Sequence, residues 1–206
     1  MGAEGPSRES ASRKDGAEAS CASGEVGAEA SCACGDAGAS CGCVEVGVPA
    51  IDGRALVAEA IAAREGAYVP YSHFAVGAAL LDSTGTVWRG CNIENAAYTP
   101  SNCAERTAFF KAVSEGVHGF VAIAIVGGPE GAPVSEWCAP CGVCRQVMRE
   151  FCDPDTFQVV LGRSADEWRT YLLRDILPMG FGPEDLGRPA PGTSEDHGGP
   201  ASGASE

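Results

Sequence analysis

The chain has 206 residues, eleven cysteines and a formal net charge of −14 at pH 7. This acidity argues against a non-specific nucleic-acid or anionic-membrane surface, because both need clustered Lys and Arg. No run approaches the roughly 20 apolar residues of a membrane-spanning helix. The sequence therefore predicts neither a nucleic-acid nor a membrane partner.

Both ends of the chain are low in complexity. Residues 1–49 repeat a Gly-Ala-Glu-Ala-Ser-Cys unit imperfectly and contain almost no large apolar side chain, and residues 188–206 are similar. Such segments cannot bury enough apolar surface to offset the entropy lost on ordering. We expect two disordered tails around one domain at 50–187. The five cysteines of the first tail fit a drifted repeat better than a metal site.

Cysteine usage bears on the compartment. The first 20 residues lack the apolar core of a secretory signal. Without such a signal, many cysteines favour a reducing compartment, where neighbouring cysteines are more often metal ligands or redox groups than disulfides. We therefore expect a cytoplasmic protein.

The central domain begins with a predicted helix and a predicted hairpin. Asp52 is suited to cap a helix over 53–66. The apolar stretch 74–82 predicts a buried strand, which the turn Ser83–Gly85 connects to a returning strand at 86–90.

Two further helices alternate with two further strands. Residues 103–116 predict a helix that stops at Gly116, and 120–128 predicts a strand covered on both faces. Residues 141–151 predict the next helix and 157–162 the next strand. The order α-β-β-α-β-α-β indicates an α/β fold, one sheet with helices on both faces.

Cysteines stand at the start of both later helices. Cys141 and Cys144 are three residues apart, so their thiols share one helix face. Cys103 opens the other helix. The positive end of a helix dipole stabilises thiolates, which are metal ligands. Three protein ligands and one open position are the pattern of a catalytic zinc site.

Glu105 follows the first of these cysteines by two residues. A zinc deaminase combines metal ligands, a Pro-Cys-x-x-Cys pair and a nearby glutamate that is not a ligand. Cys138 precedes Pro140 and lies outside the predicted helix, so we expect it not to bind metal. As a fourth ligand it would instead close the site into a structural one.

Five segments, in this order, resemble the cytidine deaminases of the short, homotetrameric kind: FAVGAALL, GCNIENAAY, CAERTA, PCGVCRQVMREF and ILPMGFGPEDL. The resemblance covers about 68–187. It implies a three-layer α/β/α cytidine deaminase-like fold with a mixed five-stranded sheet. It also assigns Zn²⁺ to Cys103, Cys141 and Cys144, and leaves Cys138 without a role.

The resemblance implies a reaction, the hydrolytic deamination of cytidine and 2′-deoxycytidine to uridine and 2′-deoxyuridine plus ammonia. This is a step of pyrimidine salvage. Zinc-bound hydroxide would attack C4 while Glu105 shuttles protons. Arg106 and Gln146 would stand behind the ligands, with Arg106 donating to their sulfur atoms.

Substrate contacts also follow from the resemblance. Asn92 and Glu94 would hold the ribose 3′-hydroxyl, Phe74 would stack on the base, and the Ala104 backbone would read the pyrimidine. Tyr98 and Phe181 match positions that family members contribute across subunit boundaries. Because the dimeric members have a second, degenerate domain for which this chain has no room, we expect a homotetramer with shared active sites.

Three other functions remain open at this point. A structural zinc module would use Cys138 as its fourth ligand. A thiol redox protein would use Cys141 and Cys144. A deaminase of nucleoside antibiotics is the third, although the intact Asn-Ile-Glu-Asn segment at 92–95 argues against it.

Overall fold

A computed structural model describes residues 50–189 and 191. The predictions for residues 1–49, and nearly all of those for 188–206, lie outside this part of the chain. The described elements are, in order, α1 Gly53–Arg64, β1 Phe74–Asp82, β2 Val87–Cys91, α2 Ala104–Ser114, β3 Phe120–Pro129, α3 Gly142–Phe151, β4 Gln158–Ser164, β5 Glu167–Leu172, α4 Leu173–Ile176 and the 3₁₀ helix Pro183–Leu186.

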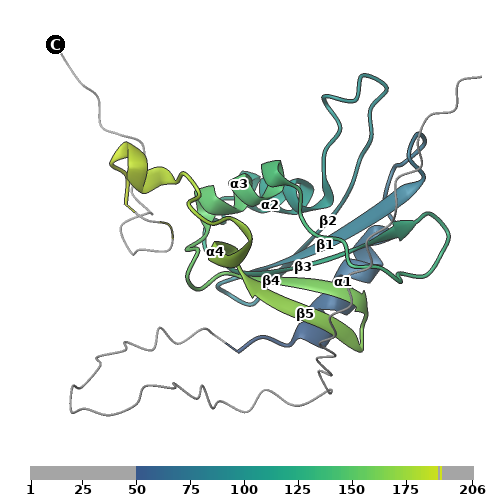
Figure 1. The fold of residues 1–206 in the computed structure, drawn as a ribbon, viewed down its shortest axis with the longest axis horizontal. Coiled ribbons are helices and arrows are strands. Elements are labelled where there is room, and N and C mark those ends of the chain that lie inside the picture. The colour runs from purple at the N-terminus through teal and green to yellow at the C-terminus, as the bar shows by residue number, and fades with distance from the viewer. Residues whose placement is uncertain (1–49, 190, 192–206) are drawn as a thin grey trace, which may run out of the picture. The chain divides into compact units, whose positions relative to one another are not determined.

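The five strands form one mixed sheet in the order β2-β1-β3-β4-β5 (Figure 1). β1 is antiparallel to both of its neighbours, β3 and β4 are parallel, and β5 is antiparallel to β4. As a result β2 and β3 run in the same direction, and both end at the edge of the sheet where β1 begins. The mixed sheet expected from the family resemblance is confirmed.

Helices cover the sheet on both faces, with α2 and α3 on one and α1 on the other (Figure 1). The larger core cluster lies under α2 and α3 around Phe109, Ile123 and Met148. The smaller one lies under α1 and includes Leu56 and Val57. Because β3 contributes to both clusters, its apolar run is buried on both sides as its sequence predicts. The three-layer architecture is confirmed.

Two aspartates fix local structure near the first helix and hairpin. The side chain of Asp52 accepts a hydrogen bond from the Ala55 amide and caps α1, as expected. Asp82 ends β1, and its carboxylate accepts from the amides of Thr84 and Thr86 and from the indole N–H of Trp88. These bonds hold the turn that reverses the chain into β2.

The residue pattern alone did not predict β5. Four of its six residues are exposed, because β5 is an edge strand and carries Glu167, Trp168 and Arg169. An edge strand with polar residues lacks the apolar run that marks a buried strand. Within the described part of the chain, no helix is long and apolar enough to cross a bilayer.

Glycines allow two helices to approach the sheet closely. At Gly77 of β1, an added Cβ would lie 2.1 Å from the carbonyl oxygen of Ala60 in α1. At Gly90 of β2, it would lie 2.4 Å from the carbonyl oxygen of Ala104 in α2. Both distances are below van der Waals contact with backbone atoms, so any larger residue would push the helix outward.

We expect Gly90→Ala to destabilise the protein by about 1–3 kcal/mol, because the new methyl group overlaps the backbone of α2. Gly66→Ala is a matched control, since its Cβ would meet nothing closer than 3.6 Å. Urea denaturation of both variants measures the difference. Equal stability of the two would show that α2 can shift without cost.

Candidate active site

Three thiols converge where α2 and α3 begin. Cys103 is the N-cap of α2, Cys141 is the N-cap of α3, and Cys144 lies in the first turn of α3. The sulfur of Cys141 lies 3.9 Å from that of Cys103 and 3.5 Å from that of Cys144. All three sulfur atoms lie within 4.8 Å of one another. The three predicted ligands are therefore neighbours in space.

The spacing of these sulfur atoms fits a zinc ion. Zn–S bonds of about 2.3 Å in tetrahedral geometry place ligand sulfurs about 3.8 Å apart. The two separations, 3.5 and 3.9 Å, bracket this value. Thiolates are also soft ligands that zinc accepts readily. The donor set and its geometry thus fit Zn²⁺ with one coordination position left open.

A neighbouring thiol and a guanidinium favour the thiolate form of Cys103. A hydrogen bond from Cys144, and another from Arg106, lower the pKa of Cys103 to about 5. The pKa of Cys144 is raised, because its thiol donates to Cys103 and is buried. Arg106 also donates to the Ser101 carbonyl at 3.0 Å, which holds the guanidinium beside the Cys103 sulfur at 3.8 Å. Arg106 therefore lies where the family resemblance placed it.

Glu105 is only 4% exposed, although it stands in the first turn of α2. Burial raises the pKa of its carboxyl group to about 7. A carboxyl with this pKa can both accept and donate a proton near neutral pH. It differs from an ordinary helix-start acid, which remains in water and ionised.

A cavity of about 320 Å³ opens beside Cys103, Cys141 and Glu105. This volume lies within the usual range of about 300–1,000 Å³ for small-molecule sites. Its walls combine two thiols of the cysteine cluster with other residues of the β2–α2 loop and the β3–α3 loop. The lining residues with polar or reactive side chains are Asn92, Glu94, Tyr98, Ser101, Asn102, Cys103, Glu105, Cys138 and Cys141.

Comparison with known proteins assigns this arrangement to a family. The family model described as the cytidine and deoxycytidylate deaminase zinc-binding region matches residues 51–160. The chain belongs to the cytidine deaminase family. The structural-zinc and thiol-redox interpretations are thereby set aside in favour of an enzyme family.

Individual cytidine deaminases are similar to this chain over nearly their own whole length. Those of Sporosarcina psychrophila and Halalkalibacterium halodurans are each 53% identical over 136 residues, which is 66% of this chain and 96% and 98% of theirs. The crystal structure of cytidine deaminase from Burkholderia pseudomallei is 50% identical, has a TM-score of 0.55, and covers 62% of this chain and 97% of its own.

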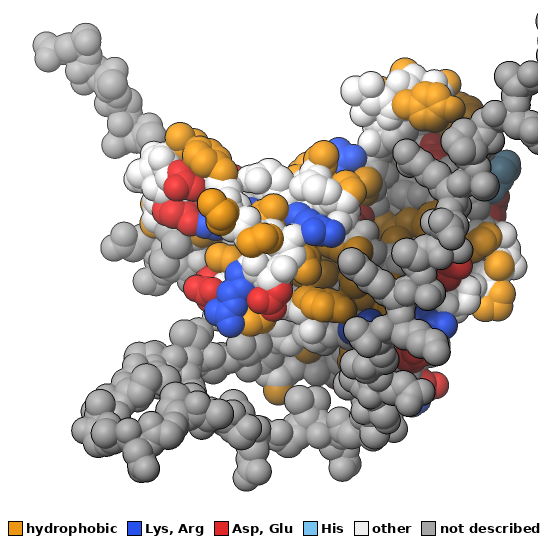
Figure 2. Space-filling view, in the orientation of Figure 1, with side chains coloured by type: hydrophobic (Ala, Val, Ile, Leu, Met, Phe, Trp, Pro, Cys, Tyr) orange, Lys and Arg blue, Asp and Glu red, His pale blue; other side chains and the backbone are white. Residues whose placement is uncertain are grey.

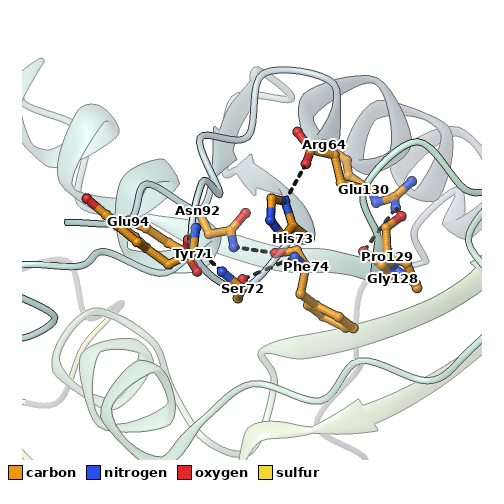
Figure 3. Close-up of polar contacts among 10 residues, drawn as sticks. All are labelled: Arg64, Tyr71, Ser72, His73, Phe74, Asn92, Glu94, Gly128, Pro129 and Glu130. Atoms are coloured by element: carbon orange, nitrogen blue, oxygen red, sulfur yellow. Dashed lines mark hydrogen bonds and ion pairs between the residues drawn. The ribbon is translucent and has the colours of Figure 1, made fainter. Parts of the chain in front are cut away.

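The residues expected to bind ribose lie on one wall of the cavity. The Asn92 amide bridges the Phe74 carbonyl and the Val76 amide at 2.9 and 2.8 Å, which leaves one N–H and one lone pair unused. Hydrogen bonds from Ser72 and Tyr71 lower the pKa of Glu94 below its ordinary value. Both side chains are therefore held by backbone groups and retain capacity for a sugar hydroxyl (Figure 3).

The aromatic residues expected at the site are placed differently from one another. Tyr98 lines the cavity at the tip of its loop, where its backbone has a φ of 56°. The Phe74 ring lies beside Gly127, as does Cys138 of the lining, but Phe74 itself is not part of the lining. Phe181 is exposed and is not part of the lining. Within one chain, the structure thus brings Tyr98 to the site but leaves Phe181 outside.

Gln146 has no described contact with the cysteine cluster. Its exposed amide donates instead to the Phe181 carbonyl at 2.9 Å and so holds the C-terminal segment on α3. The side chain points away from the ligands because Cys144 and Gln146 are two residues apart on a helix. Its expected place behind the ligands therefore has no support among the described residues.

Cys138 lines the cavity but is outside the cluster of three. Burial raises the pKa of its thiol to about 11, so it stays protonated at neutral pH. Its sulfur packs against Gly127 of β3, where an added Cβ would lie only 2.6 Å away.

Sequence reasoning missed Gly127, as well as Val76, Ser101 and Asn102 of the lining. The only sequence signal for Ser101 and Asn102 was the Asn-Ile-Glu-Asn segment at 92–95, which lies in the same β2–α2 loop.

We expect the purified protein to contain one zinc ion per chain, and Cys103→Ser or Cys144→Ser to lose it. Cys138→Ala should keep the metal, because that thiol lies outside the cluster. Elemental analysis of dialysed protein measures the zinc content. Zinc loss in Cys138→Ala with retention in Cys103→Ser would contradict this ligand assignment.

Proposed function

We propose that this chain catalyses the zinc-dependent hydrolytic deamination of cytidine and 2′-deoxycytidine, giving uridine and 2′-deoxyuridine plus ammonia. One observation carries the proposal: Cys103 and Cys141 of the three-thiol cluster and the buried Glu105 line one nucleoside-sized cavity in a chain of the cytidine deaminase family. The catalytic domain is proposed to span residues 50–187. We propose a cytoplasmic location from the cysteine-rich composition.

Cys103, Cys141 and Cys144 would hold the zinc ion. When bound, zinc supplies Lewis acidity that lowers the pKa of a coordinated water molecule. Arg106 contributes by donating to the Cys103 sulfur, which draws negative charge away from the three-thiolate set. This assignment is supported by the sulfur spacing and by the position of both helix N-termini.

Glu105 would move the protons. The C4–O bond forms from the water oxygen and the C4–N4 bond breaks. The two protons of water end on ring N3 and on the departing ammonia, and Glu105 carries each of them in turn. Its burial supports this role, because the carboxyl group exchanges protons with the substrate rather than with bulk water.

The remaining wall would orient the nucleoside. Asn92 and Glu94 are proposed to bind the 3′-hydroxyl, which ribose and deoxyribose share. The backbone of Ala104, at the open N-terminus of α2, would receive the pyrimidine. Phe74, whose ring lies beside Gly127, would cover the face of the base. Together these groups hold C4 toward the metal and Glu105.

We expect Glu105→Gln to reduce cytidine deamination by at least about 10²–10⁴-fold, because the amide cannot carry a proton. The loss of cytidine ultraviolet absorbance measures the rate. The zinc content should stay at one per chain, since Glu105 is not a ligand. Wild-type turnover matched by the variant would refute the proton-carrier role, and an inactive wild type with bound zinc would refute the proposed reaction.

We also propose a homotetramer in which neighbouring chains complete each site. Large hydrophobic side chains are exposed on α2, α3 and the C-terminal segment, namely Phe110, Val143, Met179, Phe181 and Leu186. Figure 2 shows hydrophobic side chains between charged ones on this face. Burial of such side chains between subunits would be favourable. Phe181 does not line the cavity of its own chain, which supports a role in a neighbouring one.

We expect light scattering to give a tetramer, and mixed assemblies to reveal the sharing. Chains with Phe181→Ala and chains with Glu105→Gln should regain activity when co-expressed, because each supplies what the other lacks. Co-expression of Glu105→Gln with Cys141→Ser is the control and should regain none, since both residues belong to one chain's site. A fully active monomer would contradict the shared site.

A further inference from the structure

Arg64 at the end of α1 is a buried cation held by backbone alone. Its side chain is 6% exposed. The guanidinium donates to four carbonyl oxygens at 2.5–3.0 Å, those of Ala75, Gly128, Pro129 and Ala132. Among the residues that the structure describes, no carboxylate forms an ion pair with it. Because a buried charge is costly unless hydrogen bonds satisfy it, the guanidinium and these four carbonyls hold one another in place.

The four carbonyls belong to two segments that meet at the edge of the sheet. Ala75 lies at the start of β1 and pairs in register with Gly128 at the end of β3. Pro129 is opposite Phe74, and Ala132 lies in the loop that follows β3. The Arg64 guanidinium therefore ties the first residues of β1 to the exit of β3. Figure 3 shows its bonds to Gly128 and Pro129 at that exit.

The same segment of β1 carries the nucleoside-facing wall. Arg64 binds the carbonyl of Ala75, while Asn92 binds the carbonyl of Phe74 and the amide of Val76 on either side. Ser72 lies two residues before Phe74. Its amide donates to the Glu94 carboxylate, and its hydroxyl accepts from the Phe74 amide. Within the described part of the chain, the side-chain hydrogen bonds of Asn92 and Glu94 thus go to residues 71–76, which include Ala75 of the Arg64 anchor.

The loop before β1 needs such an anchor. His73 has a φ of 53°, in the left-handed region that non-glycine residues rarely adopt. Its carbonyl accepts from the Glu130 amide, and its ring Nδ1 lies 3.1 Å from the Glu130 carboxylate (Figure 3). Glu130 lies between Pro129 and Ala132, which Arg64 also holds. The strained loop is therefore tied to the same β3 exit.

We propose that Arg64 is a positioning residue for nucleoside binding, which acts by holding residues 72–76 and, through them, Asn92, Glu94 and Phe74. This inference rests on the proposed function. Arg64 itself contacts neither the cavity nor the cysteine cluster. Its loss should therefore weaken substrate binding and leave zinc and Glu105 in place.

A guanidinium suits this task better than other side chains. It presents five N–H donors in a rigid plane, so one side chain reaches carbonyls of two segments at once. A lysine ammonium can bind some of these carbonyls, and a methionine of similar length can bind none. Arg64→Lys and Arg64→Met therefore form a graded pair of substitutions.

The experiment measures kcat and KM for cytidine, zinc content and amide hydrogen exchange in the full-length wild type and both variants. In Arg64→Met we expect KM to rise about 10- to 100-fold with kcat within about threefold. The reason is that misplaced binding groups weaken the binding of the substrate and of the transition state equally. Arg64→Lys should lie between it and the wild type. Exchange should accelerate at residues 71–76 in the same order, with one zinc per chain throughout. Arg174→Met is the control, since it removes an exposed arginine that pairs with Asp155.

The possible outcomes are distinct. An unchanged KM in Arg64→Met, or a fall in stability with kinetic constants intact, would overturn the positioning role alone. A wild type that does not turn over cytidine would overturn the proposed function and this role with it. If Arg64→Met does not fold, Arg64→Lys and Glu130→Gln test the same connection, and an unchanged KM in both would likewise overturn it.

Discussion

The active site depends on one constraint, the meeting of the N-termini of α2 and α3 above the ends of β2 and β3. Both strands are antiparallel to β1, so they end at the same edge of the sheet. Their following helices begin there and present Cys103 and Cys141 at their positive ends. Gly90 allows α2 to lie against β2, because a side chain at that position would overlap its backbone. The thiol cluster, the buried Glu105 and the cavity all follow from this approach.

Two buried ionisable groups on opposite faces of the sheet serve different ends. Arg64 has its charge satisfied by four carbonyls, and such a group holds structure in place. Glu105 has a pKa raised to about 7, mainly because burial removes it from water. A group whose charged and neutral forms are so closely balanced is suited to proton transfer. In the proposed function, Arg64 would position the nucleoside-binding residues and Glu105 would transfer protons.

Local patterns predicted most of the elements but not those that depend on neighbours. The cap at Asp52, the strand 74–82 and the helix start at Cys141 are confirmed, because each follows from short-range backbone chemistry. The edge strand β5 was not predicted from its residues, since exposure removed its apolar signal. Gln146 was expected near the ligands and instead holds the C-terminal segment, a contact 35 residues away in sequence.

The sequence by itself determined the family, the paired thiols of Cys141 and Cys144 and the glutamate behind Cys103, because these are spacings within single helices. The tertiary structure alone decided that the sulfur of Cys103 lies 3.9 Å from the sulfur of Cys141, which is 38 residues away in the sequence. It also decided the burial of Glu105 and the four carbonyls that Arg64 binds. Such properties depend on strand order and on how closely helices pack against the sheet. No local pattern encodes these distances, since they arise only when distant segments exclude water together.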